Sequence, residues 1–262
     1  MEVNFCKYEG AGNDFILVDN RKLDFPSTDH DLIKHLCDRR FGIGADGLML
    51  LQPLEDFDFN MLYYNADGKE SSMCGNGGRC IAAFAGRLGI TREKARFMAV
   101  DGEHMAELVS SDYVKLNMKD VTSVETGPDY YLLNTGSPHY VAFFSSISAM
   151  DVFTEGRNIR YNGKFRENGI NVNFVEDRGD HIFVRTYERG VENETLACGT
   201  GVVAAVICSA LKKKHDKNSY TMPVKVPGGS LKVSCSVHEG RFTNIWLEGP
   251  ATFVFEGKIK IK

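Results

Sequence analysis

Two cysteines in this chain each precede a glycine-rich turn and a helical stretch. Cys74 opens Cys-Gly-Asn-Gly, and Cys198 opens Cys-Gly-Thr-Gly. A cysteine at the start of a helix lies beside backbone N–H groups that have no partner inside the helix, and the helix dipole favours negative charge there. We therefore expect a thiol pKa lowered from about 8.5 toward neutrality. The glycines leave the N–H groups accessible to a ligand carboxylate.

The segment around the first cysteine is repeated around the second. Residues 64–77 and 187–201 both run from a strand through a polar loop to the cysteine, its glycines and a helix. The two cysteines lie 124 positions apart, nearly half of the 262-residue chain. A repeat at this spacing predicts two structurally similar halves.

Two such thiols suit a reaction that inverts a carbon stereocentre. Inversion needs a base on one face of the carbon and an acid on the other, and a thiolate and a thiol of matched pKa exchange these roles in the reverse reaction. Both helix N-termini can stabilise a carboxylate that takes up charge in the transition state. A lone cysteine before a glycine turn is more often a packing residue, but the repeat favours catalysis. No role is assigned to the other five, which are Cys6, Cys37, Cys80, Cys208 and Cys235.

The local patterns predict an α+β fold. Short runs rich in β-branched and aromatic residues, bounded by Gly, Asn and Asp, predict strands. They lie at 3–8, 15–18, 59–64, 105–109, 113–118, 130–133, 140–144, 170–175, 182–187, 231–237 and 243–247. Helices are expected at 29–40, 75–88, 146–157 and 199–213.

The repeat also predicts how the chain divides. We expect a first domain over residues 1–117 with Cys74, which a strand near 252–262 is a candidate to complete, and a second over 118–251 with Cys198. The helix over 202–211 is apolar on nearly every face, so sheet should surround it. Each half is thus expected to be a curved, mostly antiparallel sheet wrapped around one central helix. The active site is expected in the cleft between the halves.

Composition excludes several other classes of protein. A formal net charge of −4 and a pI near 6.0 argue against a nucleic-acid-binding face. The first residues lack a basic segment followed by an apolar run, and no apolar stretch approaches 18 residues, so we expect a cytoplasmic protein with no membrane association. Seven cysteines without dense spacing suit a reducing compartment. The sequence contains no Cys-x-x-Cys or His-x-x-x-His pair that would predict a zinc site.

Five motifs resemble those of the diaminopimelate epimerase family. They are Gly10-Ala-Gly-Asn-Asp-Phe15, Asn65-Ala-Asp-Gly68, Met73-Cys-Gly-Asn-Gly-Gly-Arg-Cys80, Tyr187-Glu-Arg-Gly190 and Ala197-Cys-Gly-Thr-Gly201. They cover essentially the whole chain in the family's order, and the third block is highly specific. The resemblance implies interconversion of LL- and meso-diaminopimelate in bacterial lysine and peptidoglycan precursor synthesis. It also implies two pseudosymmetric domains, a homodimer, and no need for pyridoxal phosphate or a metal.

The resemblance further implies roles for polar residues around the cysteines. Asn65, Asn171 and Arg189 would hold the distal amino-acid end of the substrate, and Glu188 would pair with an ammonium group and tune a thiol. Asn13 would contact the reacting end. The backbone N–H groups that would hold the reacting carboxylate are those of Gly75, Asn76, Gly199 and Thr200. Without the resemblance, the asparagines would be interpreted as turn residues, and Glu188 with Arg189 as a solvated ion pair.

Three further positions either match the family or depart from it. His139 matches a family histidine that tunes the thiols, a task that suits imidazole near neutral pH. Ser137 stands where many members have an asparagine that contacts substrate, and Gly47 replaces a glutamine found in some members. These departures do not touch the two cysteines but leave the substrate contacts open.

Two alternatives remain. A proline or hydroxyproline racemase or a phenazine-pathway-like isomerase would share the fold, but such racemases tend to carry histidine at the position of Asn76, and their substrates have no distal end for Arg189. A ligand-binding or thiol redox protein would use the same cleft without catalysis; reversible oxidative inactivation is expected of the two-thiol enzyme.

Overall fold

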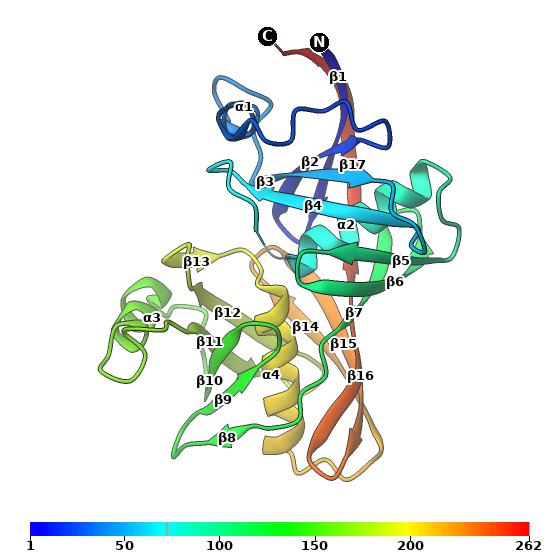
Figure 1. Cartoon of the computed structure of the whole chain (residues 1–262). Coiled ribbons are helices and arrows are strands. Elements are labelled where there is room, and N and C mark those ends of the chain that lie inside the picture. The colour runs from blue at the N-terminus through cyan, green and yellow to red at the C-terminus, as the bar shows by residue number, and fades with distance from the viewer. Residues whose placement is uncertain (72, 262) are drawn as a thin grey trace. The chain divides into compact units, whose positions relative to one another are not determined.

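The computed structural model describes residues 1–71 and 73–261 of the chain. Two compact units divide it: Met1–Leu116 together with Gly249–Lys262, and Asn117–Glu248. Lys262, the last residue of the strand expected near 252–262, lies outside the described residues. Mixed α and β structure, mostly sheet with a few helices, confirms the α+β prediction (Figure 1).

The first unit is built on eight strands and two helices. In chain order they are β1 (Glu2–Gly10), β2 (Asn13–Asp19), α1 (His30–Cys37), β3 (Gly47–Gln52), β4 (Phe59–Asn65), α2 (Gly75–Arg87), β5 (Lys94–Ala99), β6 (Gly102–Ser110), β7 (Tyr113–Met118) and β17 (Thr252–Lys260). The strands pair in the order β17-β1-β2-β3-β4-β5-β6-β7. Only β2–β3 and β4–β5 are parallel in this series.

The second unit contains nine strands and two helices. They are β8 (Glu125–Thr126), β9 (Tyr131–Asn134), β10 (Pro138–Phe144), α3 (Val152–Arg160), β11 (Asn171–Asp177), β12 (Ile182–Glu188), β13 (Asn193–Thr195), α4 (Gly199–Lys212), β14 (Ser219–Val226), β15 (Gly229–His238) and β16 (Arg241–Pro250). The pairing order is β8-β9-β10-β11-β12-β14-β15-β16. The short strand β13 adds to β12.

The two units therefore repeat one topology. Each has the pairing sequence antiparallel, antiparallel, parallel, antiparallel, parallel, antiparallel, antiparallel. The parallel pairs lie where a helix connects the strands, as a parallel connection requires. Register aligns the halves residue by residue, because Phe15 pairs with Gly47 in one unit as His139 pairs with Asn171 in the other.

In each unit, one buried helix packs against the strands of the sheet. In α2, every residue from Gly75 to Ala85 is buried, and the helix contacts β1, β2, β3 and β6. In α4, nearly all residues are buried, and the helix contacts β9 to β12 as well as β14 and β15. Figure 1 shows α4 with strands on more than one side. The apolar stretch 202–211 is thus enclosed by sheet, as its sequence indicates.

The two shorter helices differ from their expected limits because of aspartate side chains. The helix expected over 29–40 ends at Cys37, because the carboxylate of Asp38 accepts the N–H groups of Arg40 and Phe41 and turns the chain. The helix expected over 146–157 instead begins after Asp151, whose side chain accepts the N–H of Thr154, and runs to Arg160. Such local side-chain bonds compete with the helical pattern.

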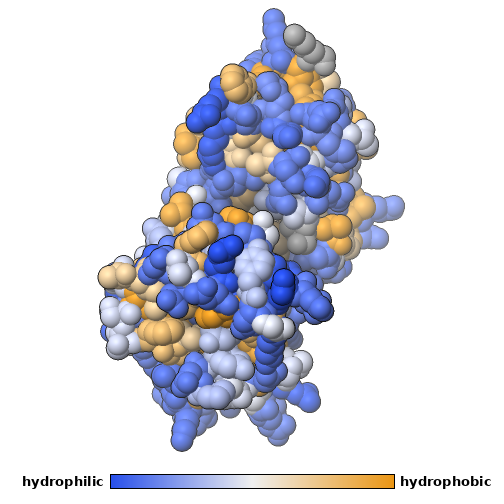
Figure 2. Space-filling model, turned by 90° about the vertical axis from the view of Figure 1, so that its left-hand side faces the viewer, coloured by the Kyte–Doolittle hydropathy of each residue, from blue (hydrophilic) through white to orange (hydrophobic). Residues whose placement is uncertain are grey.

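The surface is mostly polar. Figure 2 shows hydrophilic side chains over most of the face in view, with apolar groups scattered among them. Of the helices in residues 1–71 and 73–261, none is both long and apolar enough to span a membrane.

Candidate functional site

Both cysteines of the repeat are the N-cap residues of the central helices. Cys74 precedes α2 and Cys198 precedes α4, each with an extended backbone. Their carbonyl groups accept the first helical hydrogen bonds, from Gly78 at 2.7 Å and from Val202 at 2.9 Å. The first turns, which present N–H donors to anions, contain the predicted carboxylate-binding residues Gly75, Asn76, Gly199 and Thr200.

The other five cysteines lie in different surroundings. Burial raises the thiol pKa of all of them, to about 12 for Cys37 and about 11 for Cys235, and upward also for Cys6, Cys80 and Cys208. A raised pKa keeps these thiols protonated and unreactive at neutral pH.

Cys198 lies beside the half-buried carboxyl group of Glu188. Its sulfur is 3.6 Å from the hydroxyl oxygen of Thr200 and forms a side-chain hydrogen bond with Glu188. Thr195 donates its hydroxyl to Glu188 at 2.8 Å. Burial raises the pKa of Glu188, although the hydrogen bonds from Thr195 and Cys198 oppose this. The thiol of Cys198 is thus hydrogen-bonded to a carboxyl group whose pKa is raised by burial.

Ser137, Asn171 and Arg189 form a second cluster in the same unit. Asn171 donates from Nδ2 to the hydroxyl of Ser137 at 2.8 Å and accepts the backbone N–H of Arg189 at Oδ1, at 2.9 Å. The guanidinium of Arg189 is exposed and lies 3.4 Å from the Ser137 hydroxyl. Asn171 also donates from Nδ2 to the carbonyl oxygen of Pro138 at 3.0 Å, so it holds Ser137 and Arg189 in place. The guanidinium of Arg189 and the hydroxyl of Ser137 together suit a carboxylate.

His139 is fully buried on β10 next to Asn173, whose Oδ1 lies against Gly201 of the second Cys-Gly-x-Gly motif. Burial lowers its pKa to about 3, and the charge of Arg189 lowers it further in the same direction. The imidazole is therefore neutral at physiological pH. Its Nδ1 lies 3.1 Å from Nδ2 of Asn173, a fully buried residue of β11.

In the first unit, two predicted substrate residues contact each other. Nδ2 of Asn76 donates to Oδ1 of Asn13 at 2.6 Å, and Nδ2 of Asn13 donates to Asp46 at 2.9 Å. Arg79 donates from Nη2 to Oδ1 of Asn76 at 3.0 Å. A directed chain of hydrogen bonds therefore runs from a guanidinium through two amides to a carboxylate. The donor-only and acceptor-only ends fix the orientation of both amides.

Arg79 itself is fully buried on α2. It also donates to the carbonyl groups of Gly75 at 3.1 Å and Pro250 at 3.3 Å. In the part of the chain that the structure describes, no carboxylate lies within ion-pair distance of it. A buried cation without a carboxylate is costly unless another anion compensates it. Cys74 is among the groups whose charge acts on Arg79.

Asn65 and Gly47 lie opposite each other on neighbouring strands. Asn65 ends β4 and is exposed. A side chain added at Gly47 would come within 2.5 Å of the Tyr63 ring and the Tyr64 carbonyl oxygen. The backbone at this position therefore has no room for a side chain.

Sequence reasoning missed Arg79, Asp46, Asn173 and Thr195. Arg79 and Asn173 carried a detectable signal, since each is a polar residue inside an otherwise apolar helix or strand segment. Such residues are rarely buried without a specific partner. Asp46 and Thr195 lie in loop or edge segments where polar residues are ordinary.

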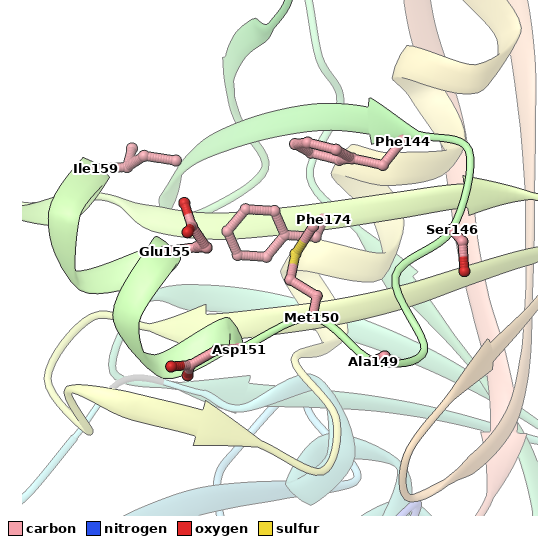
Figure 3. Close-up of a pocket in the computed structure, with 8 residues that line it drawn as sticks. All are labelled: Phe144, Ser146, Ala149, Met150, Asp151, Glu155, Ile159 and Phe174. Carbon is pink, nitrogen blue, oxygen red and sulfur yellow. The ribbon is translucent and has the colours of Figure 1, made fainter.

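One pocket lies away from the residues described above. A pocket of about 620 Å³ is lined by Phe144, Ser146, Ala149, Met150, Asp151, Glu155, Ile159 and Phe174 (Figure 3). None of the predicted site residues lines it. We assign it no role, because its lining is mostly apolar and brings no reactive groups together.

The fold matches several solved structures. A phenazine biosynthesis protein of the PhzF family from Bacillus anthracis superposes with a TM-score of 0.77 over 100% of both chains, at 14% identity. A hydroxyproline epimerase from Agrobacterium vitis with bound trans-4-OH-L-proline gives a TM-score of 0.68 over 98% of this chain and 92% of that one, at 12% identity. At such identities the likeness shows the two-domain fold alone.

Sequence comparison is more specific. The family model described as diaminopimelate epimerase matches residues 5–124 and 131–254. A diaminopimelate epimerase of Flavobacterium psychrophilum is 51% identical over 97% of this chain and 98% of its own. One of Chlorobaculum tepidum is 43% identical over 96% and 99%. The chain belongs to the diaminopimelate epimerase family, a family of isomerases, which confirms the resemblance seen in its motifs.

Proposed function

We propose that this enzyme interconverts LL- and meso-diaminopimelate by two-base proton transfer between Cys74 and Cys198, without a cofactor. The observation that carries the proposal is the duplication: topologically equivalent helices each begin with an N-cap cysteine followed by Gly-x-Gly. Family membership supports the substrate, since its matched relatives are named for diaminopimelate.

The proposed mechanism uses one cysteine as thiolate base and the other as thiol acid. The base removes the α-proton on one face of the carbon, and the acid returns a proton on the other. The first turns of α2 and α4, with Gly75, Asn76, Gly199 and Thr200, would stabilise the substrate carboxylate as it takes up negative charge. For this, the substrate carbon must lie between the two cysteines in a cleft between the halves.

The remaining site residues would bind and orient the substrate. Asn13 would contact the reacting end. Glu188, hydrogen-bonded to Cys198, would tune that thiol and pair with an ammonium group. His139 would stabilise thiolate charge. The distal amino-acid end would be held by Asn65, Ser137, Asn171 and Arg189, three of which already form a cluster.

Isotope exchange tests the substrate and the residues together. The protein is incubated with LL-diaminopimelate in D2O, and loss of the α-proton signal is followed by NMR. Cys74→Ala and Cys198→Ala should each lower the exchange rate at least about a hundredfold, because each removes one proton-transfer group. Cys208→Ala, a buried thiol on the same helix as Cys198, is the matched control and should remain active.

The controls separate the competing functions. Exchange into proline instead of diaminopimelate would keep the chemistry and change the substrate. No exchange into either from folded, reduced protein would contradict the epimerase and favour a binding protein. Full activity after a chelator and a carbonyl reagent that traps pyridoxal phosphate is expected of cofactor-independent catalysis.

We also propose a cytoplasmic homodimer. The seven cysteines lack the dense spacing of a disulfide scaffold, which suits a reducing compartment. Light scattering of the purified protein should give twice the chain mass of 29.2 kDa; a monomer would contradict the dimer.

A further inference from the structure

Asn173 holds the imidazole of His139 through a fully determined set of hydrogen bonds. Both side chains are completely buried. Nδ2 of Asn173 lies 2.9 Å from the carbonyl oxygen of Tyr140 and 3.1 Å from Nδ1 of His139. Oδ1 of Asn173 accepts the hydroxyl of Thr186 at 3.0 Å.

These contacts fix which way the amide points. A carbonyl oxygen only accepts hydrogen bonds, so the atom of Asn173 that faces Tyr140 must be the NH2 group. The opposite orientation would bring two carbonyl oxygens to 2.9 Å. The hydrogen-bond network therefore settles an assignment that atom positions alone leave ambiguous.

The amide orientation in turn fixes the tautomer of the histidine. The NH2 group has two hydrogens; one goes to Tyr140, and the other faces Nδ1 of His139. Nδ1 must then be the acceptor, so in the neutral ring the proton is on Nε2. Nε2 is buried and has no hydrogen-bond partner among the described residues. A buried N–H group without a partner is costly, which makes a ligand for it at the site favourable.

We propose that His139 acts as a hydrogen-bond donor through Nε2 to an anion at the site, and that Asn173 is the positioning residue that keeps it in this form. The proposal rests on the proposed function and gives His139 a specific task within it. The acceptor is an anion of the reaction, a cysteine thiolate or the substrate carboxylate. His139 then stabilises negative charge but does not remove the thiol proton, because its basic nitrogen is occupied by Asn173.

The first unit shows that this polar arrangement is not a requirement of the fold. By register, His139 corresponds to Phe15, Asn173 to Met49 and Thr186 to Tyr63. The same backbone positions beneath the helix are therefore filled by large side chains with apolar contacts, including an edge-on contact of the Phe15 and Tyr63 rings. The second unit carries three buried polar groups where the first needs none.

NMR of protein labelled with ¹⁵N-histidine tests the tautomer directly and without substrate. The chain has seven histidines, and the His139 signals are assigned by their loss in His139→Gln. We expect an unprotonated Nδ1 and a protonated Nε2, unchanged from pH 5.5 to 9. A His139 with its proton on Nδ1, or one that titrates in this range, would overturn the proposal.

An isosteric variant of the positioning residue provides the second test. In Asn173→Asp, the acid has at most one hydrogen, which the carbonyl oxygen of Tyr140 requires. None is left for Nδ1 of His139, so that nitrogen must carry the proton and Nε2 of the neutral ring can no longer donate. We expect the ¹⁵N pattern to change and kcat/KM to fall about tenfold or more. Thr186→Val is the matched control: it removes the bond to Oδ1 but leaves both Asn173 donors, so the Nε2–H form should persist. Loss of that form in Thr186→Val as well would contradict the assigned role of the Asn173 donors.

Substitution of the histidine separates donation from base catalysis. His139→Gln offers an amide donor but cannot take up a proton. The phenyl ring of His139→Phe can neither donate a hydrogen bond nor take up a proton. We expect the glutamine variant to be at least about tenfold more active than the phenylalanine variant; equal loss with a normal fold would favour a base. If the Nε2–H form is found but diaminopimelate does not exchange, the proposed function fails while the tautomer assignment stands.

Discussion

The two units share a strand order and a helix start, yet their cysteines have different neighbours. Cys198 has a half-buried carboxyl group, Glu188, hydrogen-bonded to it, whereas the corresponding position before Cys74 is the amide residue Asn65. Five residues after Cys74 is the buried cation Arg79; five residues after Cys198 is Val203. Duplication supplied two equivalent backbones, and substitution then gave each thiol its own electrostatic surroundings.

This difference matters for the proposed mechanism, because one cysteine would act as a base while the other acts as an acid. A buried cation favours a thiolate, while a carboxyl group of raised pKa beside a thiol favours a shared proton. We therefore expect Cys74 to be the better resting base and Cys198 the better resting acid. The helix N-terminus cannot make the two cysteines differ in this way, because each of them lies at one.

Removal of the buried cation should have the largest effect. Arg79→Met keeps the length of the side chain but loses the charge and the bond to Asn76, so we expect kcat/KM to fall by about ten- to a hundredfold, a loss of about 1.4–2.7 kcal/mol. Steady-state kinetics in both directions measures this.

Arg79→Lys shows which property matters. If charge dominates, the lysine variant should retain most activity; if orientation of the amides dominates, it should do as poorly as methionine. Val203→Met, at the corresponding position of α4, is the control for packing. Unchanged kinetics in Arg79→Met would remove the proposed inequality of the two thiols.

The pH dependence of stability should differ between the units. The pKa of His139 is lowered by burial to about 3, from an ordinary value near 6.5. The unfolded chain therefore binds a proton that the folded chain does not, and stability is complete above pH 6.5 and lost as the pH falls toward 3. Between pH 6.5 and pH 5, the free energy of unfolding should fall by about 2 kcal/mol because of this group.

In the first unit, stability begins to be lost only at a lower pH. Burial alone would raise the pKa of Asp14, but hydrogen bonds and charge from Arg39 and Lys7 outweigh it and lower the pKa to about 2. The stability from Asp14 is present above about pH 3.8 and lost below it. Urea unfolding of His139→Phe should show a smaller decline between pH 7 and pH 5 than the unsubstituted protein; equal slopes would contradict the assignment.

A pair of glycine substitutions should change the stability of the fold and not the chemistry of the site. A Cβ at Gly77 would meet the terminal methyl group of Met49, whereas a Cβ at the equivalent Gly201 would meet Oδ1 of Asn173. Methionine can move aside, but Asn173 is held by three hydrogen bonds. We expect Gly201→Ala to destabilise by about 1–3 kcal/mol and Gly77→Ala by less than about 1 kcal/mol. Thermal unfolding of both variants measures the difference, and the reverse order would contradict a rigid Asn173.

The fold class and the central helices could be predicted because their signals are local. The Cys-Gly-x-Gly motif, the apolar helix and the turn residues all lie within a few positions of one another. The strand β3 was missed because Gly47–Gln52 is buried on both faces and shows no alternation. Continuous burial of this kind is typical of a strand with a parallel neighbour, and β3 pairs in parallel with β2.

The hydrogen bonds that give the site its chemistry could not be predicted from sequence. Asn173 contacts a carbonyl 33 positions away, and Arg79 one that is 171 positions away. No local pattern specifies such partners; only the folded topology brings them together. Local patterns thus pointed to Cys74 and Cys198 at the helix starts, while polar residues such as Asn13, His139 and Arg189 were inferred only from the family resemblance. Arg79 and Asn173, which are held by distant partners, were missed.

The place of β17 in the chain affects the order in which the protein can be assembled. This strand begins at Thr252, after the whole of Asn117–Glu248, but it pairs with β1 at Glu2–Gly10. During synthesis, all strands of the second unit are made before β17. Until β17 is made, one edge of β1 is unpaired and can pair with other chains. The half of the protein that the ribosome makes first is therefore the half that is completed last.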